Sequence, residues 1–445
     1  MCGIAGFWGR GAPRVVYELL LELQHRGHEG AGIAYKTGSS IVLEGGSGLV
    51  YEAIDSHRLP SAPVLAVGHV RYSTSGPYGS VIQPLIVSAD GVDIAVAFNG
   101  NIVNYVDAAR EVLGVEAGWD AEVLARLIAH YYTEEGSLAD AMRRTAEVIR
   151  GSYAIVAISS RGELLAARDP HGIRPAAYAI TDGVVAVASE TAALEALGYE
   201  WRELRRGEIL YCQEGHCSLE PLGQEAEPRP CVFEYVYFSR PDSVFEGVEV
   251  YRARVEMGRR LARLDDTPVD VVAPVPDSGR AAATGYALER GLPLVEVLYP
   301  SRFRGRAFIM PPGARGDRIR VKYGLLRSAI RGRRIALVDD SIVRGSTAAR
   351  LSRLLREAGA REVHMRSASP PVVCPCPLGI DFPSPSELVA RGRSVEEIRE
   401  LLGVDTLLYN TLENLVAAVG RPVCTACFSC RYPRLVEKYV GLFKR

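Results

Sequence analysis

The chain has 445 residues, which is more than one ordinary hydrophobic core accommodates and predicts two or three domains. Its 48% apolar and 24% charged residues are typical of a globular protein, and a formal net charge of −1 gives no electrostatic reason to bind nucleic acid or membranes. No apolar run approaches the roughly 20 residues of a membrane helix, and no secretory signal precedes the first strand. We therefore expect a cytoplasmic, reducing compartment, where nine cysteines indicate catalysis or metal binding more than disulfides.

Short, apolar, β-rich runs dominate residues 1–230, and few long helices are predicted there. The strand candidates include residues 64–70, 94–98 and 153–158. Amphipathic helices fit residues 14–24, 121–133 and 137–149. This half is therefore predicted to be an α+β domain with mostly antiparallel strands.

A polar stretch with Glu, Pro and Arg, residues 223–230, predicts a linker, and the pattern changes after it. Buried-type strands are predicted at 269–275, 335–338 and 362–366, with helices at 281–290 and 347–358. Strands and helices that alternate at this spacing predict βαβ units and a parallel sheet. Residues 231–445 are therefore expected to form an α/β domain with a helical, cysteine-bearing tail from about residue 385.

Cys2 is the most informative residue of the first half. Removal of Met1 would leave a free α-amino group on Cys2, and such a group has a pKa of roughly 7.7–8.0, so that part of it is an unprotonated base near neutrality. A base beside a thiol generates the thiolate, which is the nucleophile. A lone cysteine at this position would more often be a buried apolar residue, but candidate partners recur downstream.

Four downstream residues could complete a site that cleaves a carboxamide. Negative charge develops on the carboxamide oxygen, and the Asn99 side-chain amide and the Gly100 N–H suit an oxyanion hole. Arg71 could bind the α-carboxylate of a free amino acid and Asp120 its α-ammonium. Taken singly, these residues predict a hairpin turn at 99–100, a surface arginine and a helix cap. Their occurrence together with Cys2 favours a catalytic site.

Four runs of the sequence resemble the class II glutamine amidotransferases. They are Cys2–Gly6, Leu23–Gly27, Gly68–Thr74 and Asn99–Asn104. The resemblance implies an N-terminal-nucleophile (Ntn) hydrolase with a four-layer αββα sandwich. It also implies that Cys2 attacks the amide of glutamine, releases ammonia and forms a thioester that water hydrolyses. His28, Gly30 and Phe98 stand where the family usually has Gln, Ser and His, and none of them carries a role assigned above.

A second constellation lies at the end of a predicted strand. The adjacent carboxylates of Asp339 and Asp340 can bind a cis diol, directly or through a metal. The following turn, residues 344–347, enters a helix, and its N–H groups and hydroxyls form an anion nest. A carboxylate pair that can bind a diol, next to a turn that can bind a phosphate, predicts a ribose 5-phosphate site. A capped βα turn with a charged pair would explain only part of this run.

This run resembles the phosphoribosyl pyrophosphate (PRPP) loop of type I phosphoribosyltransferases. Val275–Arg280 resembles their pyrophosphate loop, and residues 306–322 resemble their mobile catalytic loop. The resemblance implies that PRPP is bound by Asp277, Ser278, Gly279, Lys322, Asp339, Asp340, Arg344, Gly345, Ser346 and Thr347. It further implies Mg²⁺ near Ser278, Asp339 and Asp340, where the ion would offset the charge of the departing pyrophosphate.

An amidotransferase half joined to a phosphoribosyltransferase half resembles the PRPP-dependent glutamine amidotransferases over nearly the whole chain. The resemblance implies that ammonia crosses an enclosed apolar path to PRPP, giving 5-phospho-β-D-ribosylamine, glutamate and pyrophosphate, in the first step of de novo purine (IMP) biosynthesis. It also implies a homotetramer and purine nucleotide inhibitors such as AMP or GMP.

The alternatives are another class II amidotransferase, such as a glucosamine-phosphate or asparagine synthetase, and a PRPP-sensing regulator that has lost catalysis. The run 336–347 argues against the first, and Cys2 with its partners argues against the second.

Eight cysteines lie outside the Cys2 position. From spacing alone, four thiolates could hold zinc or an iron–sulfur cluster equally well. The family resemblance implies a structural [4Fe–4S] cluster held by Cys231, Cys376, Cys424 and Cys427. Cys374 and Cys430 could compete as ligands, and buried free thiols are the alternative. Cys212 and Cys217 are expected to be structural or surface thiols.

Overall fold

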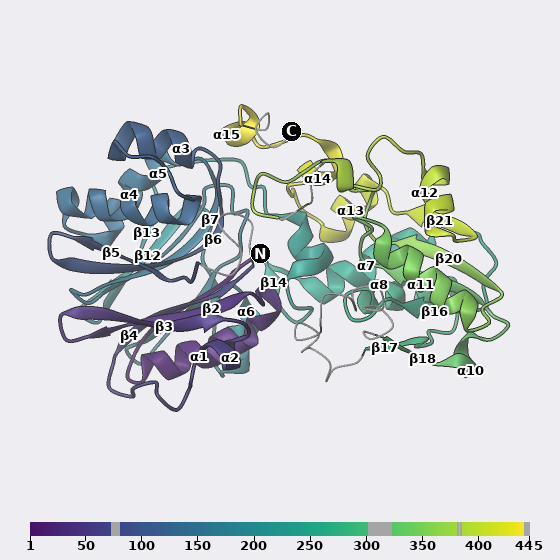
Figure 1. Ribbon diagram of the computed structural model, residues 1–445, viewed down its shortest axis with the longest axis horizontal. Helices are drawn as coiled ribbons and strands as arrows, with labels where there is room; N and C mark the ends of the chain where they lie inside the picture. The colour runs from purple at the N-terminus through teal and green to yellow at the C-terminus, as the bar shows by residue number, and fades with distance from the viewer. Residues whose placement is uncertain (73–80, 301–322, 381, 383–384, 440–445) are drawn as a thin grey trace, which may run out of the picture.

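The computed structural model describes residues 1–72, 81–300, 323–380, 382 and 385–439. Two lobes lie side by side, and the N-terminus lies between them (Figure 1). The first lobe contains the N-terminal half of the chain, coloured purple to blue, and the second contains most of the green and yellow segments. Within the described segments, no helix is long and apolar enough to span a bilayer.

Two antiparallel sheets stack face to face in the first lobe. In sheet order, the seven-stranded sheet consists of β11 (Arg202–Glu203), β9 (Ala177–Thr181), β10 (Val184–Ala188), β1 (Gly3–Trp8), β4 (Leu65–Arg71), β2 (Gly30–Thr37) and β3 (Ser40–Ser47). The six-stranded sheet consists of β13 (His216–Pro221), β12 (Glu208–Gln213), β8 (Glu163–Arg168), β7 (Gly151–Ser159), β6 (Val92–Ile102) and β5 (Leu85–Ala89).

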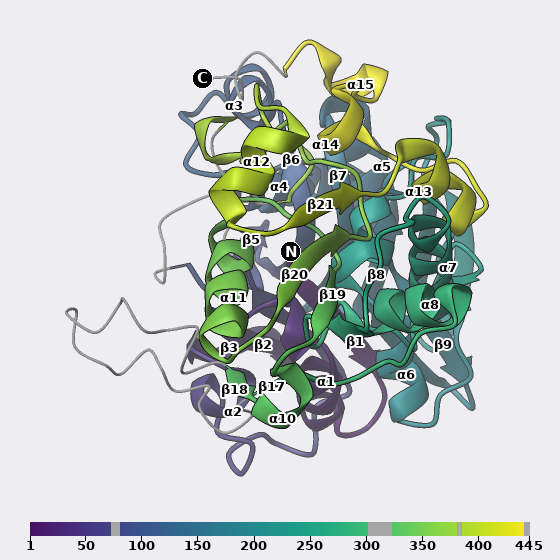
Figure 2. The ribbon, with the colours of Figure 1, turned by 90° about the vertical axis from the view of Figure 1, so that its right-hand side faces the viewer.

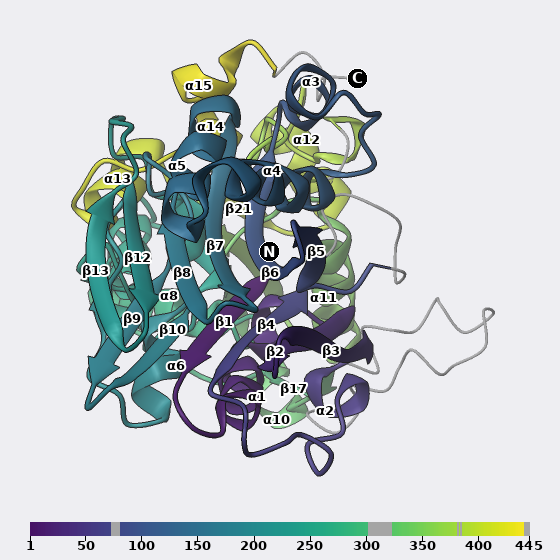
Figure 3. The ribbon, with the colours of Figure 1, turned by 90° about the vertical axis from the view of Figure 1, so that its left-hand side faces the viewer.

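Helices cover the outer faces of both sheets, which completes four layers and confirms the αββα sandwich (Figures 1 and 3). The helices α1 (Ala12–Glu22), α2 (Val50–Ala53) and α6 (Thr191–Ala196) cover the seven-stranded sheet. The helices α4 (Asp120–Glu135) and α5 (Leu138–Val148) cover the six-stranded sheet, and α3 (Tyr105–Ala108) with the π-helix η2 (Ala109–Leu113) packs beside α4. The predicted helices 14–24, 121–133 and 137–149 therefore agree with α1, α4 and α5 to within two residues at either end.

Small and β-branched residues fill the space between the two sheets. Ile4 and Val67 from one sheet meet Ala95 and Val156 from the other in one fully buried cluster. The sheets approach closely at Gly6, where a Cβ atom would lie 2.5 Å from Val156 Cγ1. Because β1 runs through the middle of this core, its first residues are held rigidly at the edge nearest the second lobe.

The second lobe is built on a parallel sheet with helices on both faces (Figure 2). In sheet order its strands are β16 (Val271–Pro274), β19 (Arg334–Asp339), β20 (Glu362–Ser367) and β21 (Thr406–Tyr409). The helices α7 (Val250–Ala262) and α8 (Arg280–Arg290) lie on one face, and α11 (Ser346–Glu357) and α12 (Val395–Leu402) lie on the other. The α/β prediction is confirmed. The tail that is predicted to be helical also contains one strand, because the apolar run at 406–409 adds β21 to the sheet edge beside β20.

Shorter elements complete the second lobe and the junction. They are η1 (Gln24–Arg26), η3 (Glu234–Phe238), β14 (Val244–Phe245), β15 (Val248–Glu249), β17 (Leu298–Pro300), β18 (Tyr323–Leu325), α10 (Arg327–Ile330), η6 (Pro385–Glu387), α13 (Leu412–Val419), α14 (Ala426–Ser429) and α15 (Arg434–Glu437). The tail returns toward the first lobe, so that α15 lies above it in Figure 1. A single buried cluster joins Met1 and Val103 of the first half to Phe233 and Leu378 of the second.

Candidate functional site

Cys2 immediately precedes β1 and lies beside a narrow cavity. The cavity is lined by Cys2, Arg71, Tyr72, Val81, Gln83, Phe98, Gly100, Trp119, Asp120 and Ala121. Four of the residues predicted for one glutamine site thus meet at one place, although they come from the start of β1, the end of β4, β6 and the start of α4. The Cys2 Sγ lies 3.5 Å from the carbonyl oxygen of Tyr72, and the side chain is partly buried.

The oxyanion candidates lie within a strand and not in a turn. Asn99 and Gly100 are part of β6, where they pair with Ala154 and Tyr153 of β7, so the hairpin-turn interpretation is wrong. Only glycine fits at position 100, because a Cβ atom would lie 2.0 Å from the carbonyl oxygen of Ser152. Asn99 is 1% exposed, and its Nδ2 has no hydrogen-bond partner among the described residues. A buried amide donor without a partner is costly unless a ligand accepts its hydrogen bond.

The two charged candidates of this site are both buried. Arg71 is 5% exposed, and its Nη1 donates to the carbonyl oxygen of Val81, so it is not a surface arginine. Asp120 is the first residue of α4 and 2% exposed. Its Oδ2 accepts from the N–H of Ile102 at 3.2 Å, which ties α4 to the end of β6.

The amino terminus itself is enclosed. Met1 is 1% exposed, and burial lowers the pKa of its α-amino group to about 4. The Met1 amine is therefore unprotonated near neutral pH. Nearby, His69 is fully buried, and burial lowers its pKa to about 3, so it is a neutral hydrogen-bonding residue that contacts the carbonyl oxygen of Phe98.

Arg26, Glu190 and Glu234 contact the Cys2 region and were not among the predicted site residues. The Nε of Arg26 donates to the carbonyl oxygen of Cys2 at 3.0 Å. Its Nη atoms pair with Glu190 Oε1 at 2.5 Å and Glu234 Oε1 at 2.9 Å. Arg26 belongs to the run Leu23–Gly27 that signalled the family, whereas no sequence pattern marks Glu190 or Glu234 as its partners.

The carboxyl end of the parallel sheet forms the second site. Asp339 ends β19, Asp340 follows it, and each is 7% exposed. Burial raises the pKa of Asp340, and hydrogen bonds from Ser278 and Ser341 offset part of that rise. The loop after β16 is therefore in contact with the paired carboxylates. At Gly279 a Cβ atom would lie 2.6 Å from the carbonyl oxygen of Val338, so the two loops approach too closely for any larger residue.

The predicted phosphate nest begins α11. Gly345 has φ +76°, a left-handed conformation that favours glycine, and Ser346 and Thr347 start the helix. Arg344 is half exposed, and its Nε donates to Glu387 at 2.8 Å. In the other loop the Asp277 carboxylate is largely exposed and pairs with Arg280. The predicted mobile loop and its Lys322 lie outside the described residues.

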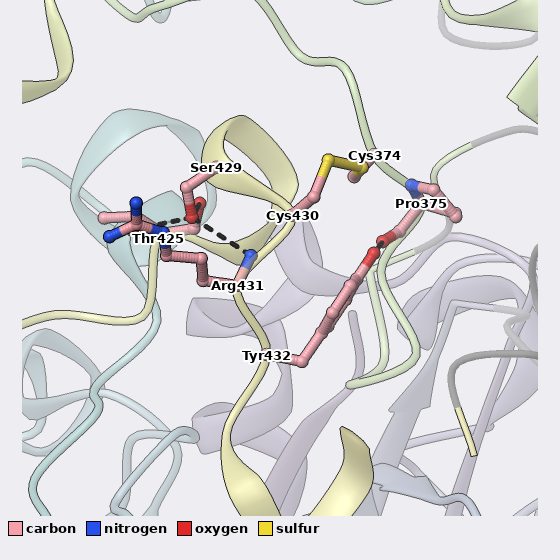
Figure 4. Close-up of a disulfide and its surroundings, with 7 residues drawn as sticks. All are labelled: Cys374, Pro375, Thr425, Ser429, Cys430, Arg431 and Tyr432. Atoms are coloured by element: carbon pink, nitrogen blue, oxygen red, sulfur yellow. Dashed lines mark hydrogen bonds between the residues drawn. A yellow bond between two sulfur atoms is a disulfide. The ribbon is translucent and has the colours of Figure 1, made fainter. Parts of the chain in front are cut away.

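The cysteines separate into two pairs and a set of free thiols. One disulfide joins Cys374 to Cys430 (Figure 4), and a second joins Cys212 to Cys217. Outside the Cys2 position, the free thiols are those of Cys231, Cys376, Cys424 and Cys427. The expectations of thiols at 212 and 217, and of competing ligands at 374 and 430, are therefore wrong. Cys212 and Cys217 are directly opposed in the β12–β13 register, with Cα atoms 4.1 Å apart, and this juxtaposition permits the bond.

The four free thiols lie where the linker meets the tail. The main chains of Cys231 and Cys424 form an isolated parallel β-bridge. The carbonyl oxygen of Cys427 accepts a hydrogen bond from the N–H of Cys374 at 3.0 Å. Burial raises the pKa of all four thiols, and the charge of neighbouring members of the set adds to the rise in Cys231, Cys424 and Cys427. Over the described ranges, no three His, Cys, Asp or Glu side chains are arranged closely enough to hold a metal ion.

Comparisons with known proteins agree with this architecture. The family profile "Glutamine amidotransferase domain" matches residues 69–196. Proteins named amidophosphoribosyltransferase are similar over 97% of this chain: that of Archaeoglobus fulgidus is 40% identical over 98% of its own length, that of Pyrococcus horikoshii 42% over 96%, and that of Bacillus subtilis 38% over 94%. The structure resembles the glutamine PRPP amidotransferase of B. subtilis complexed with ADP and GMP, with a TM-score of 0.89, 38% identity and 97% of each chain covered.

Proposed function

The chain belongs to the amidophosphoribosyltransferase family, and from this premise we propose the roles of its individual residues. The protein is an enzyme of the first step of purine biosynthesis: it hydrolyses glutamine and transfers the ammonia to PRPP, with release of glutamate and pyrophosphate. The observation that carries the residue assignment is the convergence of Cys2, Arg71, Gly100 and Asp120 on one cavity.

In the first lobe, Cys2 is the nucleophile once Met1 has been removed. Its α-amino group takes the thiol proton, and the sulfur attacks the carboxamide carbon of glutamine. Asn99 Nδ2 and the Gly100 N–H stabilise the oxyanion, and the otherwise unpartnered Asn99 donor supports this role. The C–N bond then breaks, the proton leaves with ammonia, and water hydrolyses the thioester to glutamate.

Two buried charges hold the glutamine main-chain groups. Arg71 binds the α-carboxylate through its planar guanidinium, and Asp120 binds the α-ammonium. Both lie on regular elements, at the end of β4 and the start of α4, and both line the cavity beside Cys2. Rigid support of this kind keeps the carboxamide carbon within reach of the sulfur.

In the second lobe, Asp339 and Asp340 bind the ribose diol, and residues 344–347 bind the 5-phosphate at the start of α11. Asp277, Ser278 and Gly279 bind the pyrophosphate, and family resemblance assigns Lys322 to it as well. Mg²⁺ near Ser278, Asp339 and Asp340 would offset the charge of the leaving pyrophosphate. The contact of Ser278 with Asp340 supports a shared position for these oxygen donors. Ammonia attacks C1 of PRPP, and the C1–O bond to pyrophosphate breaks.

The remaining assignments concern the architecture and environment of the enzyme. We place the domain boundary between residues 230 and 231. Cys231, Cys376, Cys424 and Cys427 are the proposed ligands of a structural [4Fe–4S] cluster; the chemistry of the donor set fits, because these four thiols are free while the other junction cysteines are paired. We also propose purine nucleotide regulation, since the B. subtilis relative was solved with ADP and GMP, a homotetramer, and a cytoplasmic location.

The test measures glutamate and pyrophosphate together. Purified enzyme is supplied with glutamine and Mg²⁺, with and without PRPP, and the Cys2→Ala variant is supplied with either glutamine or ammonium chloride. We expect PRPP-dependent glutamate release in the parent, and in the variant loss of glutamine use with retention of ammonia use. Glutamate release indifferent to PRPP would indicate another acceptor, and no glutamate release would indicate a regulator. Mass spectrometry after treatment with a glutamine-analogue electrophile checks both Met1 removal and Cys2 modification.

A further inference from the structure

A buried cluster of four charged side chains lies where the two lobes meet: Arg26, Glu190, Glu234 and Arg174, whose Nη1 lies 3.7 Å from Glu234 Oε1. The Arg26 guanidinium is 0% exposed, and it lies between the carboxylates of Glu190, 1% exposed, and Glu234, 0% exposed. Glu190 precedes α6 in the first lobe, whereas Glu234 begins η3 in the segment after the linker. One carboxylate therefore comes from each half of the chain.

Arg26 is the member of this cluster that contacts the nucleophile residue. Its Nε donates to the carbonyl oxygen of Cys2 at 3.0 Å. A guanidinium is planar and rigid, so the orientation of its Nη atoms determines the direction of the Nε–H. The carboxylates that hold the Nη atoms consequently fix the position of the Cys2 main chain.

Of the two carboxylates, Glu234 holds the guanidinium in the bidentate manner. Its oxygens accept from Arg26 Nη1 at 3.1 Å and from Nη2 at 2.9 Å. Glu190 accepts from Arg26 only through Nη1, and it also accepts from His25, the N–H of Arg240 and the Ser243 hydroxyl. A bidentate pair imposes both direction and plane, which a single contact does not.

Glu234 is itself held firmly by the second lobe. The Ser239 hydroxyl donates to its Oε2 at 2.7 Å. Arg254 of α7 donates to the carbonyl oxygens of Tyr235 at 2.6 Å and Ser239 at 2.8 Å, which anchors η3 on α7. Glu234 is therefore anchored in the phosphoribosyltransferase half, and Arg174 of the first half pairs with the same carboxylate at 3.7 Å.

We propose that Glu234 is a positioning residue for glutamine hydrolysis: it orients Arg26, and through Arg26 the main chain of Cys2, from the opposite half of the molecule. The glutamine site is then complete only when both halves are folded against each other. This inference rests on the proposed role of Cys2 as nucleophile.

The full-length Glu234→Gln variant tests the proposal, because glutamine keeps the shape of the side chain and removes its charge. Glu203→Gln is the matched control. Glu203 of β11 also links the two halves, because its carboxylate accepts the N–H groups of Glu246 and Gly247, which are its hydrogen-bond partners within the described residues. For both variants, glutamate release is measured over a range of glutamine concentrations. Ammonia-dependent pyrophosphate release and the melting temperature report on the second lobe and on folding.

We expect Glu234→Gln to lower kcat for glutamate release by about a hundredfold, as a misplaced reacting group does, with KM little changed. Its ammonia-dependent activity is expected to equal that of Glu203→Gln, which should behave as the parent enzyme. Equal glutamate release in the two variants, or parallel loss of both activities in Glu234→Gln, would overturn the proposal.

If Glu234→Gln does not fold, Ser239→Ala replaces it, since that change removes one hydrogen bond from Glu234. A selective, severalfold fall in glutamate release supports the proposal, and no change overturns it. Absence of glutamate release from the parent enzyme would instead contradict the proposed function.

Discussion

The two candidate sites differ in how their buried charges are balanced. Beside Cys2, the positive charges of Arg26 and Arg174 are matched within the protein by the carboxylates of Glu190 and Glu234. Although burial alone would raise it, His25 and Arg26 hold the pKa of Glu190 well below its usual range. At the end of β19, burial instead raises the pKa of Asp340, even though Arg254 opposes the rise.

This difference separates a site that is electrostatically complete from one that gains by binding a cation. The glutamine site has its supporting charges in place before any substrate arrives, which is the condition for preorganised catalysis. The sugar-phosphate site concentrates two adjacent carboxylates at the end of a buried strand, and a divalent ion would favour their charged forms. The two sites should therefore fail separately when their charges are changed.

The largest effect is expected from Asp340→Asn. Loss of this carboxylate should lower pyrophosphate release about a hundredfold or more with either glutamine or ammonia, because several kcal/mol of transition-state stabilisation are removed. The rate at which a glutamine-analogue electrophile modifies Cys2 in the absence of PRPP should stay as in the parent. Since burial disfavours the charged form of Asp340, the neutral asparagine should not lower the melting temperature.

The control for this prediction is Asp270→Asn, which alters an exposed carboxylate of the same lobe that pairs with Arg334. It should leave both activities unchanged. A fall in Cys2 modification that accompanies the loss of pyrophosphate release in Asp340→Asn would show that the two sites are not electrostatically independent.

Substitution of a junction cysteine is expected to affect catalysis less than Asp340→Asn does, but to remove the bound metal completely. The first lobe holds Cys212 and Cys217 as a disulfide on a hairpin, whereas the junction keeps four thiols free. Cys427→Ser should abolish bound iron and acid-labile sulfide in protein purified without oxygen, because one of four ligands is lost. Cys217→Ser should leave the iron content unchanged. Zinc in place of iron in the parent protein would refute the cluster assignment.

Features carried by adjacent residues could be predicted from the sequence. The run 339–347 gave both carboxylates and the start of α11, because a strand, a turn and a helix N-terminus are local structures. The pattern at 121–133 likewise predicted α4, and Asp120, expected as its cap, is the first residue of that helix. Cys2, Arg71 and Gly100 were identified through motifs, each of which is short enough to be recognised singly.

The partners of those residues could not be predicted in the same way. Glu190 and Glu234 lie 164 and 208 positions from Arg26, and no local pattern shows which cation either of them meets. The disulfide between Cys374 and Cys430 was missed for a related reason: it depends on how the tail folds back, across 56 residues. Tertiary packing decides these contacts, and a single sequence carries little information on it.

The smallest effect comes from a buried ion pair that has no contact with either site. Arg366 of β20 pairs with Asp265, whose side chain is 3% exposed. Burial alone would raise the pKa of Asp265, but the hydrogen bond and charge of Arg366 lower it to about 2. A depressed pKa contributes stability that is present above the unfolded value, near 3.8, and is lost as the pH falls through about 2.

Asp265→Asn should therefore lower the free energy of unfolding by about 2 kcal/mol at pH 7, and the difference from the parent should shrink as the pH falls from about 4 to about 2. Urea unfolding at a series of pH values measures it. Asp270→Asn, which breaks an exposed pair, should cost less than about 1 kcal/mol. Both variants should keep full activity at pH 7. Loss of glutamate release in Asp265→Asn would mean that any buried ion pair of the second lobe supports the Cys2 site. The positioning role would then not be specific to Glu234.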